Sequence, residues 1–148
     1  MNILIVDDEI IIRALLLDVL KSDGHEVDAV GNGYDALKLA KKKDFDLVFS
    51  DVHMPEMNGY ELTAAIRGLE AHTGRITPVL AITASEFDLN EERAIEMGFT
   101  GYMLKPLNPE FCSSQLAIKK MVNNNPQTKN TLCFLATTDC ANCLARLD

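Results

Sequence analysis

Carboxylate side chains directly follow two short apolar stretches of this sequence. Residues 47–49 are Leu-Val-Phe and lead within two residues to Asp51, while residues 3–6 are Ile-Leu-Ile-Val and lead directly to Asp7 and Asp8. Short apolar runs bounded by polar residues are typical of strands buried in a parallel sheet. Because ligands collect beyond the carboxyl ends of such strands, we expect the three carboxylates to meet at one edge of the sheet.

Three neighbouring carboxylates repel one another, and the pKa of each rises unless a cation lies between them. Oxygen ligands with room for water are the set that Mg²⁺ prefers. The sequence therefore predicts Mg²⁺ as the cation that holds Asp7, Asp8 and Asp51 together.

Alternating strand and helix patterns surround these carboxylates. The hydrophobic periodicity and the Gly, Pro and Asn breaks predict an alternating series of elements. Strands are expected over residues 2–6, 25–30, 79–82 and 100–104 and in the stretch that ends at Asp51, and helices over 9–21, 34–42, 60–69, 86–97 and 109–122. Five such units with short connections predict an α/β fold, a doubly wound parallel sheet with five helices.

Two further reactive side chains fall at predicted strand ends, Thr83 and Lys105. With Mg²⁺ they form a set suited to phosphoryl transfer. Mg²⁺ and Lys105 would offset the charge of the phosphoryl oxygens, Thr83 would donate a hydrogen bond, and Asp51 would attack phosphorus. A single Asp is usually a cap or turn residue and a single Lys is usually solvated, but agreement among four strand ends favours the phosphoryl interpretation.

These motifs resemble the receiver domain of two-component response regulators over residues 1 to about 122. The resemblance implies a flavodoxin-like (βα)5 fold with strand order 2-1-3-4-5. Residues 73–79 are similar to receivers attached to hybrid histidine kinases. The segments that carry the likeness are Ile3-Leu4-Ile5-Val6-Asp7-Asp8-Glu9, residues 51–59 (Asp-Val-His-Met-Pro-Glu-Met-Asn-Gly), Ala81-Ile82-Thr83-Ala84, and residues 98–106 (Gly-Phe-Thr-Gly-Tyr-Met-Leu-Lys-Pro).

The resemblance implies a role for each matching residue. Asp51 would be the phospho-acceptor in a phosphorelay, supplied by a histidine kinase, a histidine phosphotransfer protein or a small donor such as acetyl phosphate. Asp8 and Asp51 would bind Mg²⁺ directly and Asp7 through water, and the backbone carbonyl of His53 would be a further ligand.

The same resemblance implies a conformational switch. Thr83 would shift toward the phosphoryl group with Lys105, and Tyr102 would turn inward and reshape the face formed by helix four, strand five and helix five. A plain half-exposed strand aromatic is the alternative for Tyr102. The Lys105–Pro106 bond is expected to be cis, and His53 and Ser85 would tune hydrolysis of the acyl phosphate.

The first predicted helix carries a second apolar stripe beside the one that faces the sheet. The stripe consists of Ile10, Ile11, Ala14 and Leu17. It would either pack against loops or the tail, or form a face on which a partner docks. The resemblance fits docking, since kinases and phosphotransfer helices bind receivers beside this helix.

Composition limits the function classes. The 148 residues are 47% hydrophobic and carry a net charge of −8, which argues against a nucleic-acid surface. We expect no signal peptide and no membrane span, and hence a cytoplasmic protein. A zinc site at Cys140 and Cys143 is disfavoured because Cys133 is the nearest other cysteine and no His follows.

The expected domain organisation is a receiver over residues 1–122 and a linker with a short tail of unknown role over 123–148. The expected function is a Mg²⁺-dependent phospho-acceptor switch with slow self-dephosphorylation, acting on an output protein or domain, and not a conventional enzyme. The alternatives are a phosphate sink and an inert receiver-like binding module. An aspartyl-nucleophile phosphatase is disfavoured because His53 occupies the place of its second acid.

Overall fold

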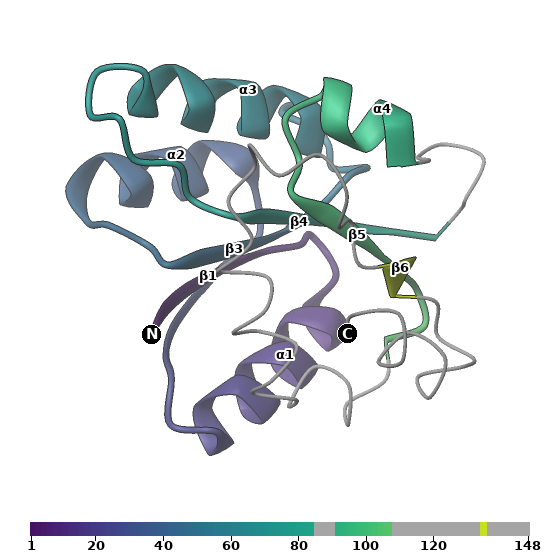
Figure 1. Cartoon of the computed structure of the whole chain (residues 1–148). Coiled ribbons are helices and arrows are strands. Elements are labelled where there is room, and N and C mark those ends of the chain that lie inside the picture. Colours follow the sequence, from purple (N-terminus) through teal and green to yellow (C-terminus); the bar gives the residue numbers. More distant parts are fainter. Residues whose placement is uncertain (85–90, 108–133, 136–148) are drawn as a thin grey trace, which may run out of the picture.

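The computed structural model describes residues 1–84, 91–107 and 134–135. Strands and helices alternate along the chain (Figure 1). The strands are β1 (Asn2–Val6), β2 (Glu26–Val30), β3 (Leu47–Asp51), β4 (Val79–Thr83), β5 (Gly101–Leu104) and β6 (Phe134–Leu135). The helices are α1 (Ile10–Ser22), α2 (Gly33–Lys42), α3 (Gly59–Glu70) and α4 (Glu91–Glu96).

The strands form one parallel sheet in the order β2-β1-β3-β4-β5-β6. The order of the first five confirms the doubly wound topology predicted from the sequence. The two-residue strand β6 was not predicted. It comes from the stretch expected to be a tail and pairs with β5, with Phe134 opposite Tyr102. The boundary at residue 122 stays a prediction.

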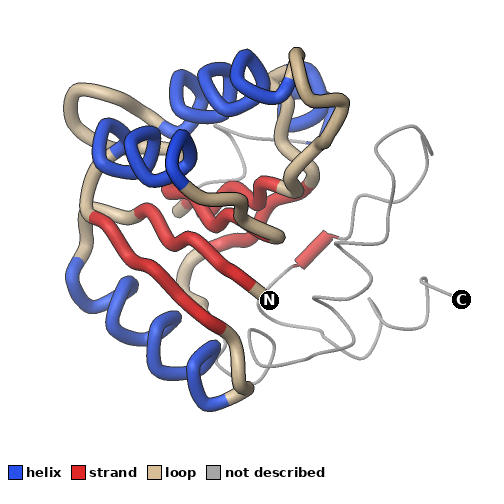
Figure 2. The backbone as a smooth tube through the Cα atoms, turned by 90° about the vertical axis from the view of Figure 1, so that its left-hand side faces the viewer, coloured by secondary structure: helices blue, strands red, loops and turns tan. Residues whose placement is uncertain are grey.

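Helices cover both faces of the sheet. Figures 1 and 2 show α1 on one face and α2, α3 and α4 on the other. Alternate residues of β1 divide between two cores, because successive side chains of a strand point to opposite faces. Ile3 and Ile5 pack with Leu16 and Leu20 of α1, and Leu4 packs with the α2 and α3 side.

Side-chain caps set where two of the helices begin. The Asn32 side chain accepts a hydrogen bond from the Asp35 amide at 2.8 Å at the start of α2, and Asn58 accepts one from the Glu61 amide at 2.9 Å at the start of α3. Each satisfies a backbone donor that has no partner within its helix. The caps fix the loops that follow β2 and β3, and the second of these loops borders Asp51.

Several expectations fall beyond the described residues. They are the first part of the helix predicted over 86–97, the helix predicted over 109–122, Ser85, all of the linker and tail over 123–148 except residues 134–135, and all four cysteines. The Lys105–Pro106 peptide bond is cis, as the resemblance to receivers implies. Within the described ranges, no helix has both the length and the apolar character needed to cross a bilayer.

Candidate phosphoryl and metal site

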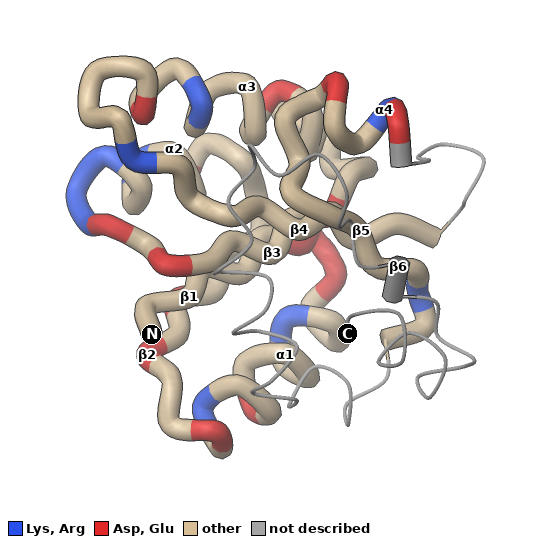
Figure 3. Tube along the Cα trace, in the orientation of Figure 1, with Lys and Arg blue, Asp and Glu red and all other residues tan. Residues whose placement is uncertain are grey.

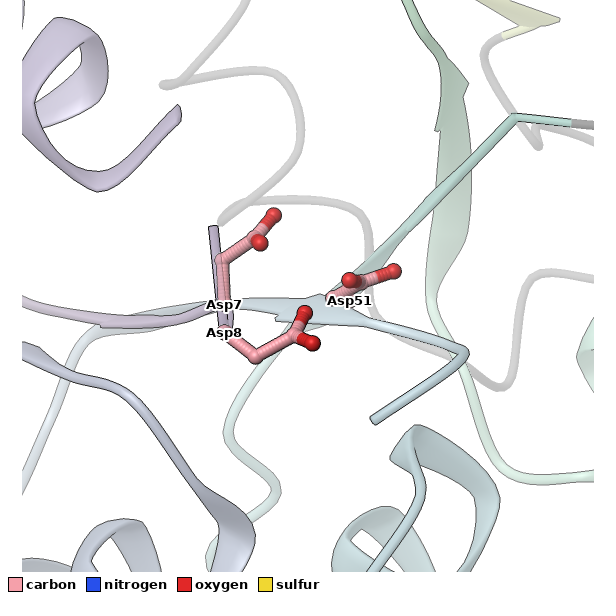
Figure 4. A group of neighbouring side chains, drawn as sticks. All are labelled: Asp7, Asp8 and Asp51. Atoms are coloured by element: carbon pink, nitrogen blue, oxygen red, sulfur yellow. The ribbon is translucent and has the colours of Figure 1, made fainter. Parts of the chain in front are cut away.

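The carboxyl ends of β1 and β3 lie side by side and bring three carboxylates together. β1 pairs with β3 in parallel, with Val6 opposite Ser50, so Asp7 and Asp51 leave neighbouring strands at the same edge. Figure 3 shows the acidic segment that joins β1 to α1, and Figure 4 shows the side chains of Asp7, Asp8 and Asp51 gathered there. One oxygen from each lies within 4.8 Å of the others.

The cluster is largely withdrawn from solvent. Asp7 is fully buried and Asp51 is 4% exposed, whereas Asp8 is exposed. Burial, followed by the charge of Asp7, raises the pKa of Asp51 to about 6 against the opposing effect of Lys105. Burial likewise raises the pKa of Asp7. These carboxylates therefore lack full charge compensation, as expected for a site that gains from a cation.

The donor set fits a hard divalent cation. Asp7 Oδ1 accepts the Glu9 amide at 2.8 Å, and Asp51 Oδ1 accepts the His53 amide at 3.3 Å. The second oxygen of Asp7, Oδ2, is buried and accepts no hydrogen bond from any residue that the structure describes, although the Lys105 ammonium lies 3.4 Å away. Oxygen ligands with an open, exposed member in Asp8 suit an octahedral ion that keeps several waters, such as Mg²⁺. The cluster can therefore hold a metal ion, while the His53 carbonyl as a ligand stays a prediction.

Lys105 supplies the positive charge of the site. It follows β5, and its Nζ lies 3.4 Å from both Asp7 Oδ2 and Asp51 Oδ2 and 2.7 Å from Glu9 Oε1. Burial lowers the pKa of Lys105, but the hydrogen bond to Glu9 and the charges of Asp51 and Asp7 outweigh it and raise the pKa. Lys105 is therefore a cation placed directly against the acceptor.

Thr83 and Tyr102, the two residues of the predicted switch, lie on the paired strands β4 and β5. Thr83 is the last residue of β4 and is fully buried, and its carbonyl accepts the Lys105 amide at 2.8 Å. Tyr102 is 8% exposed and packs in the core on the α2 and α3 side. Their movement on phosphorylation stays a prediction.

The second apolar stripe of α1 divides into exposed and packed parts. Ile10 is 72% exposed, Ile11 is 80% exposed and Ala14 is also exposed. Leu17 is partly buried and packs against the core beneath α1. The exposed part of the stripe therefore consists of the first three residues, and Leu17 serves the fold, while partner docking on this stripe stays a prediction.

Sequence reasoning missed three residues that shape the site. Glu9 pairs with Lys105, the Arg13 guanidinium donates to the Asp7 carbonyl at 2.7 Å, and Gly59 packs on the backbone of Asp51. For Glu9 a signal was present, since a third acid directly follows Asp7 and Asp8. The contacts of Arg13 and Gly59 depend on how α1 and α3 meet the sheet, which spacing does not show.

Comparison with known proteins agrees with this geometry. The sequence model of the response regulator receiver domain matches residues 3–116. The sensor histidine kinase RcsC of Salmonella typhimurium is 39% identical over 118 residues, which is 80% of this chain but 12% of that relative's length. The chain belongs to the response regulator receiver family.

Solved structures show the same fold. The chemotaxis response regulator CheY4 of Vibrio cholerae is 34% identical with a TM-score of 0.71, covering 81% of this chain and 97% of that one. The receiver domain of the Saccharomyces cerevisiae response regulator Ssk1, solved with the histidine phosphotransfer protein Ypd1, is 29% identical with a TM-score of 0.69, covering 76% and 83%.

Proposed function

We propose that this chain is a phospho-acceptor switch in which Asp51 receives a phosphoryl group from a phosphohistidine with the help of Mg²⁺. The observation that carries the proposal is the buried Asp51 carboxylate, which lies beside Asp7 and Asp8 and 3.4 Å from the Lys105 ammonium. Membership of the receiver family supports it. Homologues of this family act as signalling switches and not as conventional enzymes.

In phosphoryl transfer the protein mainly positions the reacting groups and stabilises the charge of the phosphoryl group. An oxygen of the Asp51 carboxylate attacks phosphorus, the bond from phosphorus to the donor imidazole nitrogen breaks, and its electron pair leaves with the imidazole. Asp8 and Asp51, with Asp7 acting through water, would hold the Mg²⁺ ion, which would supply positive charge beside the phosphoryl oxygens. Lys105 offsets further negative charge, and the Thr83 hydroxyl donates a hydrogen bond to a phosphoryl oxygen.

Partner docking is proposed for the exposed end of α1. Ile10, Ile11 and Ala14 lie on the helix that begins directly after the acidic cluster, so a partner held there reaches Asp51. The co-crystal of Ssk1 with Ypd1 supports a histidine phosphotransfer protein as the kind of partner. The RcsC relative supports a histidine kinase as the alternative donor.

Acetyl phosphate tests the acceptor chemistry without a partner. We expect folded wild-type protein to gain one base-labile phosphoryl group by intact mass when Mg²⁺ is present, and none after chelation. Asp51→Asn should remain unlabelled, because its amide is not a nucleophile toward phosphorus. Asp18→Asn, which alters an exposed residue of α1, should label like the wild type. Equal labelling of wild type and Asp51→Asn would contradict the proposal.

A further inference from the structure

The shortest ion pair of Lys105 is with Glu9. The Nζ atom lies 2.7 Å from Glu9 Oε1, within the range of a charge-assisted hydrogen bond, but 3.4 Å from Asp51 Oδ2. The Lys105 side chain is 14% exposed, so its ammonium is held largely within the site. In the unphosphorylated protein, Lys105 is therefore drawn most strongly to a residue other than the acceptor.

The place of Glu9 in the fold explains why its side chain is available to Lys105. Glu9 is the N-cap residue of α1 and makes no side-chain cap hydrogen bond. Glu is not among the residues favoured at this position, which are Ser, Thr, Asp and Asn. Its amide donates to Asp7 Oδ1 at 2.8 Å, which fixes its backbone beside the acidic cluster. The Glu9 carboxylate then pairs with Lys105, the residue that follows β5.

Phosphorylation would change the balance around Lys105. The ammonium has three hydrogens to donate and faces Asp7, Glu9 and Asp51 at once. A phosphoryl group on Asp51 adds negative charge and strong acceptor oxygens beside it. Lys105 can bind those oxygens only by lengthening or giving up one of its three present contacts, and the bond to Glu9 is the shortest of these.

We propose that Glu9 is a positioning residue that holds Lys105 in the unphosphorylated protein and competes with the phosphoryl group for it. Glu9 thereby lowers the affinity of the site for a phosphoryl group. The inference rests on the proposed acceptor role of Asp51 and adds to it a residue that sets how firmly the modified state is held.

The contact has a purely structural alternative, in which it only ties α1 to the segment after β5. The two roles separate in experiment. If the contact is only structural, its loss changes the free energy of unfolding and leaves the affinity for anions unchanged. If Glu9 competes for Lys105, its loss changes the affinity of the folded protein for anions.

The test uses beryllium fluoride as a phosphoryl mimic at saturating Mg²⁺. We expect Glu9→Gln to bind the mimic about two- to fivefold more tightly than wild type, the range expected for loss of one partly exposed ion pair. Glu56→Gln makes the same change in net charge at an exposed residue of the loop after Asp51, and should bind like wild type. Unchanged or weaker binding by Glu9→Gln overturns the inference, as does an equal gain in Glu56→Gln.

A second measurement follows the contact without metal or mimic. In wild type, the Lys105 ammonium should give a slowly exchanging signal in a ¹H–¹⁵N spectrum, identified by its loss in Lys105→Arg. The signal should shift or broaden in Glu9→Gln, and an identical signal would overturn the inference. If wild type fails to bind beryllium fluoride with Mg²⁺, the proposed acceptor function fails. If wild type and Glu9→Gln bind it equally, only the role of Glu9 fails.

Discussion

Asp51 is buried yet has to be ionised when it reacts. Its carboxylate is nearly inaccessible, and its pKa is raised to about 6 by burial and by Asp7, with Lys105 acting in the opposite direction. At neutral pH the unloaded site therefore holds charge at a cost in free energy. A divalent cation bound at the proposed site would relieve part of that cost.

This raised pKa predicts how stability changes with pH. An acid whose pKa is higher in the folded than in the unfolded protein binds more protons when folded, so its stabilising effect is present below about pH 4 and is lost as the pH rises through about 6. Without metal, Asp51→Asn should therefore raise the free energy of unfolding at pH 7.5 by about 1–3 kcal/mol. Urea denaturation at pH 4 and pH 7.5 measures the difference.

The control is Asp18→Asn, which should change the free energy of unfolding little at either pH because Asp18 is exposed. Mg²⁺ should stabilise wild type at pH 7.5 and have a much smaller effect on Asp51→Asn, since binding to the folded state alone adds to stability. If Asp51→Asn is less stable than wild type at pH 7.5, the account of the Asp51 charge is incorrect.

At the scale of elements, α3 begins against the backbone of the acceptor. The Gly59 amide donates to the Val52 carbonyl at 2.8 Å. A Cβ at residue 59 would overlap the Asp51 carbonyl oxygen and lie 2.9 Å from Val52 Cα. Both are backbone atoms and cannot turn aside, so glycine is required at this position.

Gly59→Ala should therefore disturb the end of β3 and with it the acceptor. We expect a loss of about 1–3 kcal/mol in the free energy of unfolding, typical of overpacking, together with weaker Mg²⁺ binding by titration calorimetry. Gly68→Ala makes the same change in the same helix, where no atom of the described residues, apart from the adjacent helix backbone, lies within 4 Å of the new methyl group. That variant should gain about 0.5–1 kcal/mol, since Ala favours helix over Gly. Similar effects of both variants would contradict the packing argument.

β1, β3, β4 and β5 were predictable from the sequence to within one or two residues because each is a short, largely buried apolar run, whereas β2 is only partly buried and was placed by Val27 and Val30. β1 is fixed at residues 2–6 by Ile3-Leu4-Ile5-Val6, and the strand ends then place Asp7, Asp51 and Lys105 at one edge. In a parallel sheet the carboxyl ends of the strands lie at the same edge, so the residues that follow each apolar run in the sequence are the ones that meet there. β6 could not be predicted as a strand of the sheet, because it has only two residues and no periodic pattern.

Contacts made by long side chains could not be predicted from the sequence. The Glu9–Lys105 pair joins residues 96 positions apart, and its formation depends on rotamers and on how far α1 lies from β5. The second stripe of α1 shows the same limit. Periodicity placed Leu17 with Ile10 and Ile11, but only the packing of α1 shows that Leu17 contacts the core while the other two are exposed.

At the scale of the whole molecule, the proposed docking face and the acceptor adjoin each other. Ile11→Glu should slow phosphotransfer from a histidine phosphotransfer protein about tenfold or more, because loss of an apolar anchor at the centre of an interface costs about 2 kcal/mol or more. Labelling by acetyl phosphate should be unchanged. Ile11 suits this test because it is 80% exposed, so its replacement leaves the core intact.

The matched control is Ile76→Glu, which alters an exposed isoleucine in the loop between α3 and β4, at the amino end of the sheet. It should label normally from both donors. Equal slowing by Ile11→Glu and Ile76→Glu would show that α1 is not the docking face. Loss of acetyl phosphate labelling in Ile11→Glu would point to damage at the acceptor instead.

The central claim is that Asp51 itself carries the phosphoryl group. Reduction of the phosphorylated protein with borohydride converts an acyl phosphate of aspartate to homoserine, and tandem mass spectrometry then locates the modified residue. The account predicts homoserine at position 51, formed only when Mg²⁺ and acetyl phosphate are both present. Homoserine at Asp7 or Asp8 instead, or no homoserine in folded protein that has gained a phosphoryl group, would contradict it.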